Sequence, residues 1–239
     1  GPERVDVLHG LAKGLDLTID YGWLWFISKM LMWLMTHIHA FVGNWGLSII
    51  LVTVVVKLAF FRMSTTSFRS MARMSEIAPK VKALQEKYGD DKAQLQRETM
   101  ALYSKEKINP LGGCLPLLIQ LPFFIGLYWA LIESIDLRQA PFVGWIHDLS
   151  VQDPYFVLPI LMGISMLVQQ MMSKNPAQDA NQQKVMMLLP VFFTFIFIHF
   201  PAGLILYMIT NNVLSVAQQE WAKRTMHSAK HSPRRKTKS

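Results

Sequence analysis

The sequence predicts an all-α polytopic membrane protein, and three observations support this fold class. Half of its 239 residues are hydrophobic and only 17% are charged, which is too apolar for a soluble domain of this size. The apolar residues lie in long runs, as helices that cross a bilayer require. The segments between these runs carry most of the cations, as the loops of membrane proteins often do.

Five apolar runs meet or approach the roughly 17 to 20 residues that a spanning helix needs. They are residues 46–61, 111–132, 155–172, 185–200 and 202–220. Several are short, which implies local thinning of the bilayer or spans that flanking residues complete. The turn signal Pro201-Ala202-Gly203 separates the last two runs. Because Pro stops a helix and Gly permits a reversal, those two helices are expected to form a hairpin.

The cations of the connecting segments predict the topology, because cytoplasmic loops are enriched in Lys and Arg. Of the 24 Lys and Arg residues, ten lie in 62–110, two in 173–184 and seven after Glu220. Five spans place these three segments on the same face of the membrane. The sequence therefore predicts that residues 1–45 and the loop at 133–154 lie outside, and that the tail at 221–239 is cytoplasmic.

The apolar stretch at residues 23–42 precedes the first run and is interrupted by polar side chains. Four of these form two pairs that are seven to eight residues, or two helical turns, apart, so they are expected to share one face. They are Ser28, Lys29, Thr36 and His37. We expect an amphipathic helix in the outer interface of the bilayer, anchored by Trp23, Trp25 and Trp33. A sixth spanning helix is the alternative, because about 20 residues would reach across.

Residues 62–110 form a charged segment between the first two runs. Positions that recur at spacings of three and four, most of them apolar, predict two amphipathic helices. These positions are Met71, Met74, Ala78, Val81, Gln85 and Tyr88, then Leu95, Thr99, Leu102 and Glu106. Gly89-Asp90-Asp91 indicates a helix stop followed by an N-cap. We expect a mobile antiparallel helix pair, which is either a solvated connector or a docking surface.

One long run combines features that are unusual in a membrane span. It is Asn109-Pro110-Leu111-Gly112-Gly113-Cys114-Leu115-Pro116-Leu117-Leu118-Ile119-Gln120-Leu121-Pro122. This run resembles the third transmembrane segment of the YidC/Oxa/Alb family of membrane protein insertases. Other stretches resemble the family in the same order, namely Asp20–Ile27, Val42–Gly46, Leu137–Phe142, Trp145–Ser150, Tyr155–Gly163 and Phe200–Tyr207. The likeness extends over about residues 17–221.

The resemblance implies five transmembrane helices around a hydrophilic groove that is open to the cytoplasm and lipid but closed outward. It also implies an interfacial helix at 23–42, a cytoplasmic helical hairpin at 63–107 and a location in the bacterial inner membrane. A first transmembrane helix and a large periplasmic domain of the family would be missing from this chain. The implied activity is membrane protein insertion, without enzymatic chemistry, metal or cofactor. The implied partners are nascent membrane proteins, the ribosome and the Sec translocon.

Lys57 is a cation within the first apolar run, where a charge at the centre of a helix costs about 2.5 to 3.5 kcal/mol. Its side chain could reach the interface, because Arg62 is only five residues further on, about 7 to 8 Å along a helix. It could instead face a wet groove. The resemblance favours the groove, because the family's groove cation, usually arginine, falls at this position. Since lysine lacks the planar guanidinium fork, we predict a role for the positive charge alone.

Polar residues in the spans are candidates to line the same cavity, because hydroxyl and amide groups in hydrocarbon must face one another or water. Thr53 lies one turn before Lys57. The candidates in the later spans are Gln120, Gln169, Thr194, Tyr207 and Asn212. Tyr207 is a predicted substrate contact, and Asn212 matches a polar position of the family's last helix. For the candidates other than Thr53 and Asn212, a hydrogen bond between helices is an equal alternative.

The basic tail from Lys223 to Lys238 lacks apolar periodicity, which predicts disorder. Anionic lipid headgroups are its favoured partner, since each cation near the surface contributes about 1 kcal/mol. Contact with ribosomal RNA is the alternative.

Other functional classes fit the sequence less well. The single cysteine, Cys114, excludes an intrachain disulfide and a cysteine-based zinc site. An intramembrane protease would need a nucleophile and base, or metal ligands, inside the spans. A secondary transporter would more often show two similar halves with helices broken at matching positions. A channel remains the main alternative to an insertase.

Overall fold

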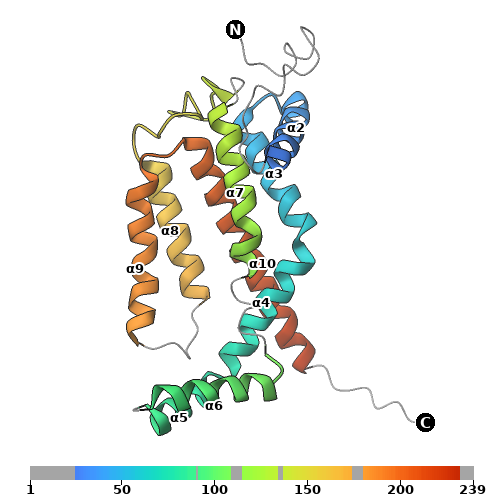
Figure 1. The fold of residues 1–239 in the computed structure, drawn as a ribbon. Coiled ribbons are helices and arrows are strands. Elements are labelled where there is room, and N and C mark those ends of the chain that lie inside the picture. The colour runs from blue at the N-terminus through green and yellow to red at the C-terminus, as the bar shows by residue number, and fades with distance from the viewer. Residues whose placement is uncertain (1–24, 90, 109–114, 134–136, 174–179, 232–239) are drawn as a thin grey trace, which may run out of the picture.

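The computed structural model describes residues 25–89, 91–108, 115–133, 137–173 and 180–231. Within these residues the secondary structure is helical and contains no strand (Figure 1). The helices are α2 Trp25–Val42, α3 Trp45–Ala59, α4 Phe61–Glu76, α5 Ala78–Tyr88, α6 Lys92–Lys105, α7 Leu115–Glu133, α8 Val157–Met172, α9 Ala180–Phe197 and α10 Ala202–His231.

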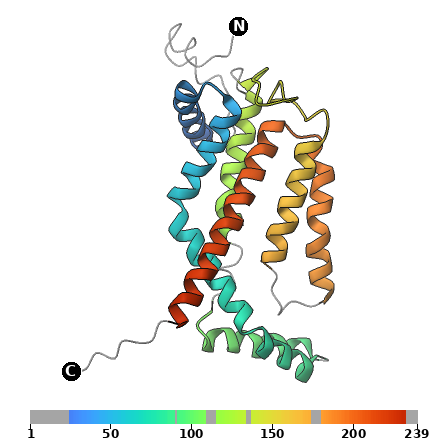
Figure 2. The same cartoon turned by 180° about the vertical axis from the view of Figure 1, so that it is seen from behind.

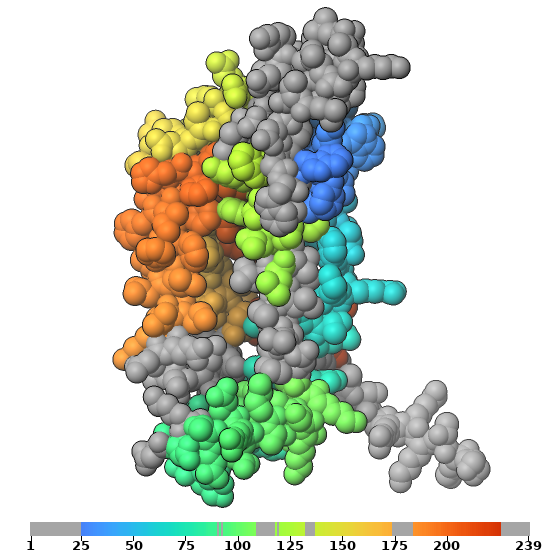
Figure 3. All heavy atoms as spheres, viewed as in Figure 1, coloured from blue at the N-terminus to red at the C-terminus, as the bar shows by residue number. Residues whose placement is uncertain are grey.

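The molecule is an elongated bundle with different structures at its two ends. Helices α3, α7, α8, α9 and α10 run alongside one another (Figures 1 and 2). The α5–α6 pair, named the hairpin, lies across one end of the bundle, below α8 and α9 in the view of Figures 1 and 3. The connection at 137–156, called the loop cap, and α2 lie at the opposite end. The hairpin and the loop cap therefore lie at opposite ends of the bundle.

The predicted apolar runs correspond to helices, with several shifted boundaries. Run 46–61 becomes α3, which ends at Ala59, and run 185–200 becomes α9, which already begins at Ala180. Positions 111–114 of the second run lie outside the described residues. Tested one at a time, none of the described helices is both long and apolar enough to cross a bilayer. Helices α3 and α4 pass that test together, but the chain bends by 70° between them.

Helix α2 packs against α3 and α7 through one apolar face. Trp25 and Trp33 are exposed, as expected of interfacial anchors, whereas Trp23 lies outside the described residues. The prediction that Ser28 shares a polar face with Thr36 is wrong. Ser28 is buried and its hydroxyl donates to the Gly126 carbonyl in α7, while Thr36 is exposed. Eight residues turn a helix by about 80° beyond two full turns, which separates these side chains.

The charged segment after α3 contains three helices rather than two. The stripe that predicted one helix is interrupted at Ile77, because Pro79 lies in the first turn of α5 and suits a helix start better than a helix interior. Asp91 caps α6 as predicted, since its carboxylate accepts from the amides of Ala93 and Gln94. A small apolar cluster joins the hairpin to α4. Its buried members are Met74, Ile77, Val81 and Ile108.

Helix α8 packs against both α9 and α10 and lies between them (Figures 1 and 2). The prediction that the last two helices form a hairpin is therefore wrong. Gly163 of α8 approaches α9 so closely that a Cβ atom there would lie 2.2 Å from the Thr194 hydroxyl oxygen. A small residue allows such contact between helices, so α9 associates with α8 while α10 passes along the other side of α8.

The loop cap is tightly organised around Asp153, whose side chain is completely buried. Its carboxylate accepts from the indole of Trp145 at 2.9 Å and from the amides of Tyr155 and Leu158 at 3.0 and 2.7 Å. Three donors are therefore satisfied by one side chain where α8 begins. The loop cap also accepts the first amides of α10: Val151 accepts from Ala202, and Leu149 from Gly203.

Helix α10 continues through the start of the basic tail, so the prediction of disorder from Lys223 is wrong as far as His231. Two interactions stabilise this extension. The Lys223 ammonium donates to the Met172 carbonyl at the end of α8, at 2.9 Å, and Arg224 pairs with Glu220 one turn earlier. The cations at 232–239 lie outside the described residues.

Candidate functional site

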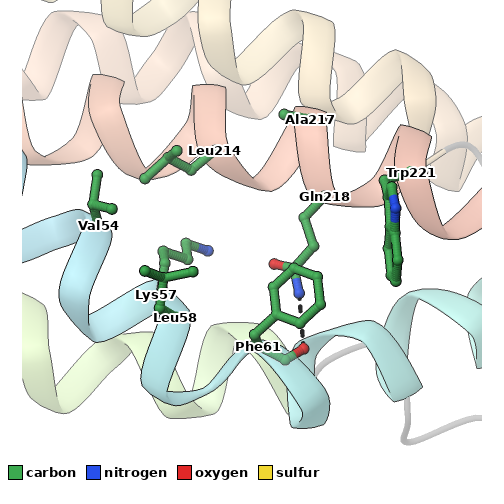
Figure 4. A pocket seen from close by; sticks show the side chains of 8 residues that line it. All are labelled: Val54, Lys57, Leu58, Phe61, Leu214, Ala217, Gln218 and Trp221. Carbon is green, nitrogen blue, oxygen red and sulfur yellow. Dashed lines mark hydrogen bonds between the residues drawn. The ribbon is translucent and has the colours of Figure 1, made fainter.

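Lys57 lies in the last turn of α3, and its side chain crosses toward α10 rather than following its own helix to the interface (Figure 4). Its ammonium donates to the Ser215 hydroxyl at 2.7 Å. That hydroxyl in turn donates to the Asn211 carbonyl at 2.7 Å. Within the described chain no carboxylate forms an ion pair with Lys57. The positive charge is therefore held inside the bundle by neutral groups.

A small, partly open space adjoins Lys57, between α3, α4, α7 and α10. It has a volume of about 30 Å³, which is enough for a water molecule. Its lining residues, which define the Lys57 cavity, are Thr53, Val56, Lys57, Phe60, Ser64, Gln120, Phe123, Tyr207 and Asn211. Four of the five predicted groove residues, Lys57, Thr53, Gln120 and Tyr207, thus meet at one cavity although they come from three helices.

The polar side chains of this cavity differ in whether they form hydrogen bonds within their own helices. Thr53 is buried, and its hydroxyl donates to the Ile49 carbonyl one turn earlier at 2.7 Å. Asn211 is only 4% exposed, and its side-chain nitrogen has no hydrogen-bond partner in the described part of the chain. A buried donor without a partner costs about 1 to 3 kcal/mol. The wall of the cavity therefore contains an amide whose nitrogen is not satisfied within the described residues.

Asn212, the fifth predicted residue, faces elsewhere. Its side-chain amide donates to the Ser165 hydroxyl at 2.9 Å and so joins α10 to α8. It lines neither the Lys57 cavity nor a larger crevice that lies between α10 and the bend joining α3 to α4. One residue along a helix turns the side chain by about 100°, which places Asn211 toward Lys57 and its neighbour toward α8. Asn212 is thus placed as an interhelical contact, separate from the other four.

Sequence reasoning did not find Asn211 and Ser215, although the sequence contains a signal for both. Tyr207, Asn211 and Ser215 are four residues apart and therefore lie on one helix face. Once Tyr207 was selected, that spacing would have favoured Asn211 over Asn212.

Two further polar candidates lie outside the Lys57 cavity. Thr194 lies against Gly163 of α8, and its hydroxyl donates to the Pro190 carbonyl at 2.8 Å. Gln169 is half-buried on α8, where its backbone carbonyl accepts from the Ser173 amide. Neither residue contributes to the lining around Lys57.

A larger crevice, the lateral crevice, opens between α10 and the bend that joins α3 to α4 (Figure 4). Its volume is about 290 Å³. The lining residues are Val54, Lys57, Leu58, Phe61, Leu214, Ala217, Gln218 and Trp221. Lys57 lines both spaces, so a mostly apolar crevice and a polar cavity share the same cation.

Gln218 fixes the bend beside this crevice. Its side-chain amide donates to the Phe61 carbonyl and to the Thr65 hydroxyl, each at 2.9 Å. Nearby, the rings of Phe61 and Trp221 pack with their centroids 5.3 Å apart. Helix α10 therefore helps to position α4, which leads into the hairpin. Among the described residues no group of three or more His, Cys, Asp or Glu side chains could hold a metal ion.

Comparison with known proteins places this arrangement in a family. The model of the family described as 60Kd inner membrane protein matches residues 37–230, and that of the YidC periplasmic domain matches residues 1–34. The membrane protein insertase YidC of Coxiella burnetii (strain Dugway 5J108-111) is 58% identical over 240 residues, covering 100% of this chain and 42% of that protein. The YidC insertase of Pseudomonas paraeruginosa is 56% identical over 229 residues, covering 96% and 39%.

A solved structure agrees with the sequence comparison. The crystal structure titled "Active YidC insertase crystal structure with the first transmembrane domain resolved" superposes with a TM-score of 0.69 and 25% identity. The alignment covers 91% of this chain and 53% of that one. The chain spans about 40% of the length of the curated relatives. The family match and these identities show that the chain belongs to the 60Kd inner membrane protein family, and they confirm the insertase resemblance predicted from the run Asn109–Pro122 and the other matching stretches.

Proposed function

We propose that this chain is the membrane-embedded core of an insertase, which moves the polar part of a newly made membrane protein across the bacterial inner membrane. The observation that carries the proposal is the Lys57 ammonium, held inside the bundle by Ser215 without a carboxylate partner among the described residues. A structural ion pair would have occupied the charge. The relatives named membrane protein insertase YidC support the same function.

The proposed topology has five spans at 46–61, 111–132, 155–172, 185–200 and 202–220. Residues 1–45 and the loop at 133–154 lie outside, and the segments 62–110, 173–184 and 221–239 are cytoplasmic. The excess of cations in the cytoplasmic segments supports this orientation. The location of the hairpin and loop cap at opposite ends of the bundle supports it too.

In the proposed mechanism, the polar or acidic segment of a client enters near Lys57 while its apolar segment passes into lipid. The lysine charge and the polar wall at Thr53, Gln120 and Tyr207 reduce the cost of removing that segment from water. The lateral crevice gives apolar side chains a surface beside the same cation. Short apolar helices would thin the bilayer locally and shorten the crossing. This process needs no catalytic step, metal or cofactor.

The proposed partners follow from the surfaces around the site. Nascent membrane proteins are the clients, and the hairpin is a docking surface for the ribosome or another partner at the cytoplasmic face. The tail cations favour anionic lipids, with ribosomal RNA as the alternative. Association with the Sec translocon is proposed from the family resemblance alone.

The test is insertion by the purified chain in liposomes of phosphatidylethanolamine and phosphatidylglycerol. A single-span client with a short acidic tail is synthesised in their presence, and protease protection of the tail measures insertion. We expect protection by the wild type and by Lys57→Arg. Loss of a charged hydrogen bond predicts a decrease of about tenfold or more for Lys57→Met.

Three results would contradict the proposal. Absence of protection with the wild-type chain would remove the insertase function for this chain. Full activity of Lys57→Met would remove the role of the charge. Ion flux through client-free proteoliposomes, without client insertion, would favour a channel.

A further inference from the structure

Asn211 is the one buried side-chain amide that lines the Lys57 cavity without a partner for its nitrogen in the described residues. Because the residue is only 4% exposed, bulk solvent does not compensate for the missing hydrogen bond. The Asn211 backbone carbonyl already accepts from Ser215, the residue that also holds the Lys57 ammonium. One short stretch of α10 therefore positions the cation and presents a free neutral donor beside it.

The groups around this donor determine what it can bind. Thr53 donates its hydroxyl proton to its own helix, and no Asp or Glu lines the cavity. The lining offers an unused amide and an ammonium that has three donors, one of which goes to Ser215. Ser64, Gln120 and Tyr207 also line the cavity and carry oxygens, but the unused amide nitrogen and the ammonium can only donate and therefore suit an oxygen acceptor. With a volume of about 30 Å³, the cavity admits a water molecule or a single side-chain end group, but not a folded segment.

Lys57 and Asn211 are suited to different acceptors. An ammonium interacts most strongly with a carboxylate, because charge-assisted hydrogen bonds are roughly twice as strong as neutral ones. A neutral amide can satisfy an uncharged carbonyl without requiring a counter-charge, and a water bound there before the client arrives can exchange for that carbonyl at little enthalpic cost. The two donors therefore distinguish acidic from neutral polar groups.

We infer that Asn211 is a specificity-determining residue that binds the uncharged carbonyl group of a client, such as the side-chain amide of Asn or Gln, beside the charge of Lys57. This inference rests on the proposed insertase function. It assigns neutral polar segments to Asn211 and acidic segments to Lys57 within one site.

The experiment compares three clients that differ at a single position of the translocated tail, which is Glu, Gln or Met. Each is tested with proteoliposomes of wild type, Asn211→Leu and Lys57→Met. Leucine matches the shape of asparagine but has no donor. Loss of one neutral hydrogen bond predicts that Asn211→Leu inserts the Gln client about two- to tenfold less than wild type does. The Met client should be unaffected, and the Glu client should respond mainly to Lys57→Met.

Asn212→Leu is the matched control, because it removes the same side chain one position along α10. It breaks the bond to Ser165, so it should lower the melting temperature and reduce all three clients alike. Asn211→Leu should leave the melting temperature unchanged or raise it, since it removes an unsatisfied buried donor.

The outcomes separate the two hypotheses. If the wild type inserts none of the clients, the proposed function fails. If the wild type inserts them but Asn211→Leu affects all three equally, or none, the assignment of Asn211 is overturned while the insertase function stands. A drop in melting temperature like that of Asn212→Leu would make Asn211 a structural residue and would also overturn it.

Discussion

The loop-cap end and the Lys57 region of the bundle treat buried polar groups in opposite ways. At the loop cap, the carboxylate of Asp153 is fully buried and satisfies three donors. Around Lys57, an ammonium has only a hydroxyl partner and the Asn211 amide nitrogen has none in the described residues. One region has its polar groups matched within the fold, whereas the other retains unused donors.

This difference indicates which region is built for stability and which for binding. Leu137, Leu149 and Leu204 are completely buried near the loop cap, and the amides of Ala202 and Gly203 are accepted by loop-cap carbonyls. A tightly packed apolar interior at this end does not favour the entry of a polar segment. Unused donors lower stability in the free protein, but they become favourable when a ligand supplies acceptors. The proposed outward closure and cytoplasmic opening follow this division.

The largest effect is expected from Asp153→Ala. It leaves the indole of Trp145 and two backbone amides without their acceptor, which predicts a loss of about 3 to 5 kcal/mol in the free energy of unfolding. Thermal unfolding of the detergent-solubilised chain measures the loss. Asp148→Ala is the control in the same loop, because Asp148 is half-buried and, among the described residues, accepts only from Ser150. Equal losses in the two variants would contradict the special role of Asp153.

Much of this contrast could not be predicted from the sequence. Composition and apolar runs predicted helices close to their observed positions, because runs of apolar residues are a local signal of buried helices. Lys57 was identified because it is a cation within such a run. The roles of Asp153 and Asn211 depend instead on contacts between distant segments. Both are ordinary polar residues in the sequence, and only the fold determines that the first is fully satisfied and the second is not.

The errors of helix arrangement have a similar origin. The turn at Pro201-Ala202-Gly203 was correctly predicted as a helix boundary, but a turn does not determine which helices pack together. The close contact between Gly163 and Thr194 does that for α8 and α9, and no local pattern revealed it. Likewise, the extension of α10 past Glu220 is stabilised by the hydrogen bond from Lys223 to the Met172 carbonyl of α8, which is distant in sequence.

The second prediction tests whether the satisfied part of the bundle tolerates added volume. In Gly163→Ala, the new methyl group would meet the Thr194 side chain, and such overpacking costs about 1 to 3 kcal/mol. Thr194→Ala removes the obstructing atoms, so the double variant should recover most of the loss. Thermal unfolding of both single variants and the double variant gives the coupling energy. Strictly additive effects would show that the two residues do not meet.

The third prediction is that a substitution in the Lys57 region does not lower the stability of the protein, in contrast to the two substitutions above. Lys57→Met removes a charge that has no carboxylate partner in the described chain. The melting temperature should therefore stay the same or rise, and the free energy of unfolding should increase by up to about 2.5 kcal/mol. Lys223→Met is the matched control. Its ammonium satisfies the Met172 carbonyl at the end of α8, so this variant should be destabilised by about 1 kcal/mol. A clear loss of stability in Lys57→Met would mean that the cation is structural.

The smallest effect concerns the hairpin, where charge pairing is exposed to solvent. Lys80 of α5 donates to the Glu106 carboxylate just after α6, and this hydrogen bond lowers the pKa of Glu106 below its ordinary value. A lowered folded-state pKa means that the pair stabilises the hairpin fully above the ordinary pKa of glutamate. The contribution is lost as pH falls through the lowered pKa.

Hydrogen exchange of the α5 and α6 amides, measured between about pH 3 and 7 and corrected for intrinsic exchange, follows this loss. Protection at the ends joined by Lys80 and Glu106 should decrease slightly as pH falls, and Glu106→Gln should remove the part of that decrease that depends on the pair. Because exposed ion pairs contribute little, the rest of the bundle should keep its protection. If protection around Lys57 changed in parallel, the hairpin and the site would be coupled through α4 and Gln218, and the two regions could no longer be treated as independent.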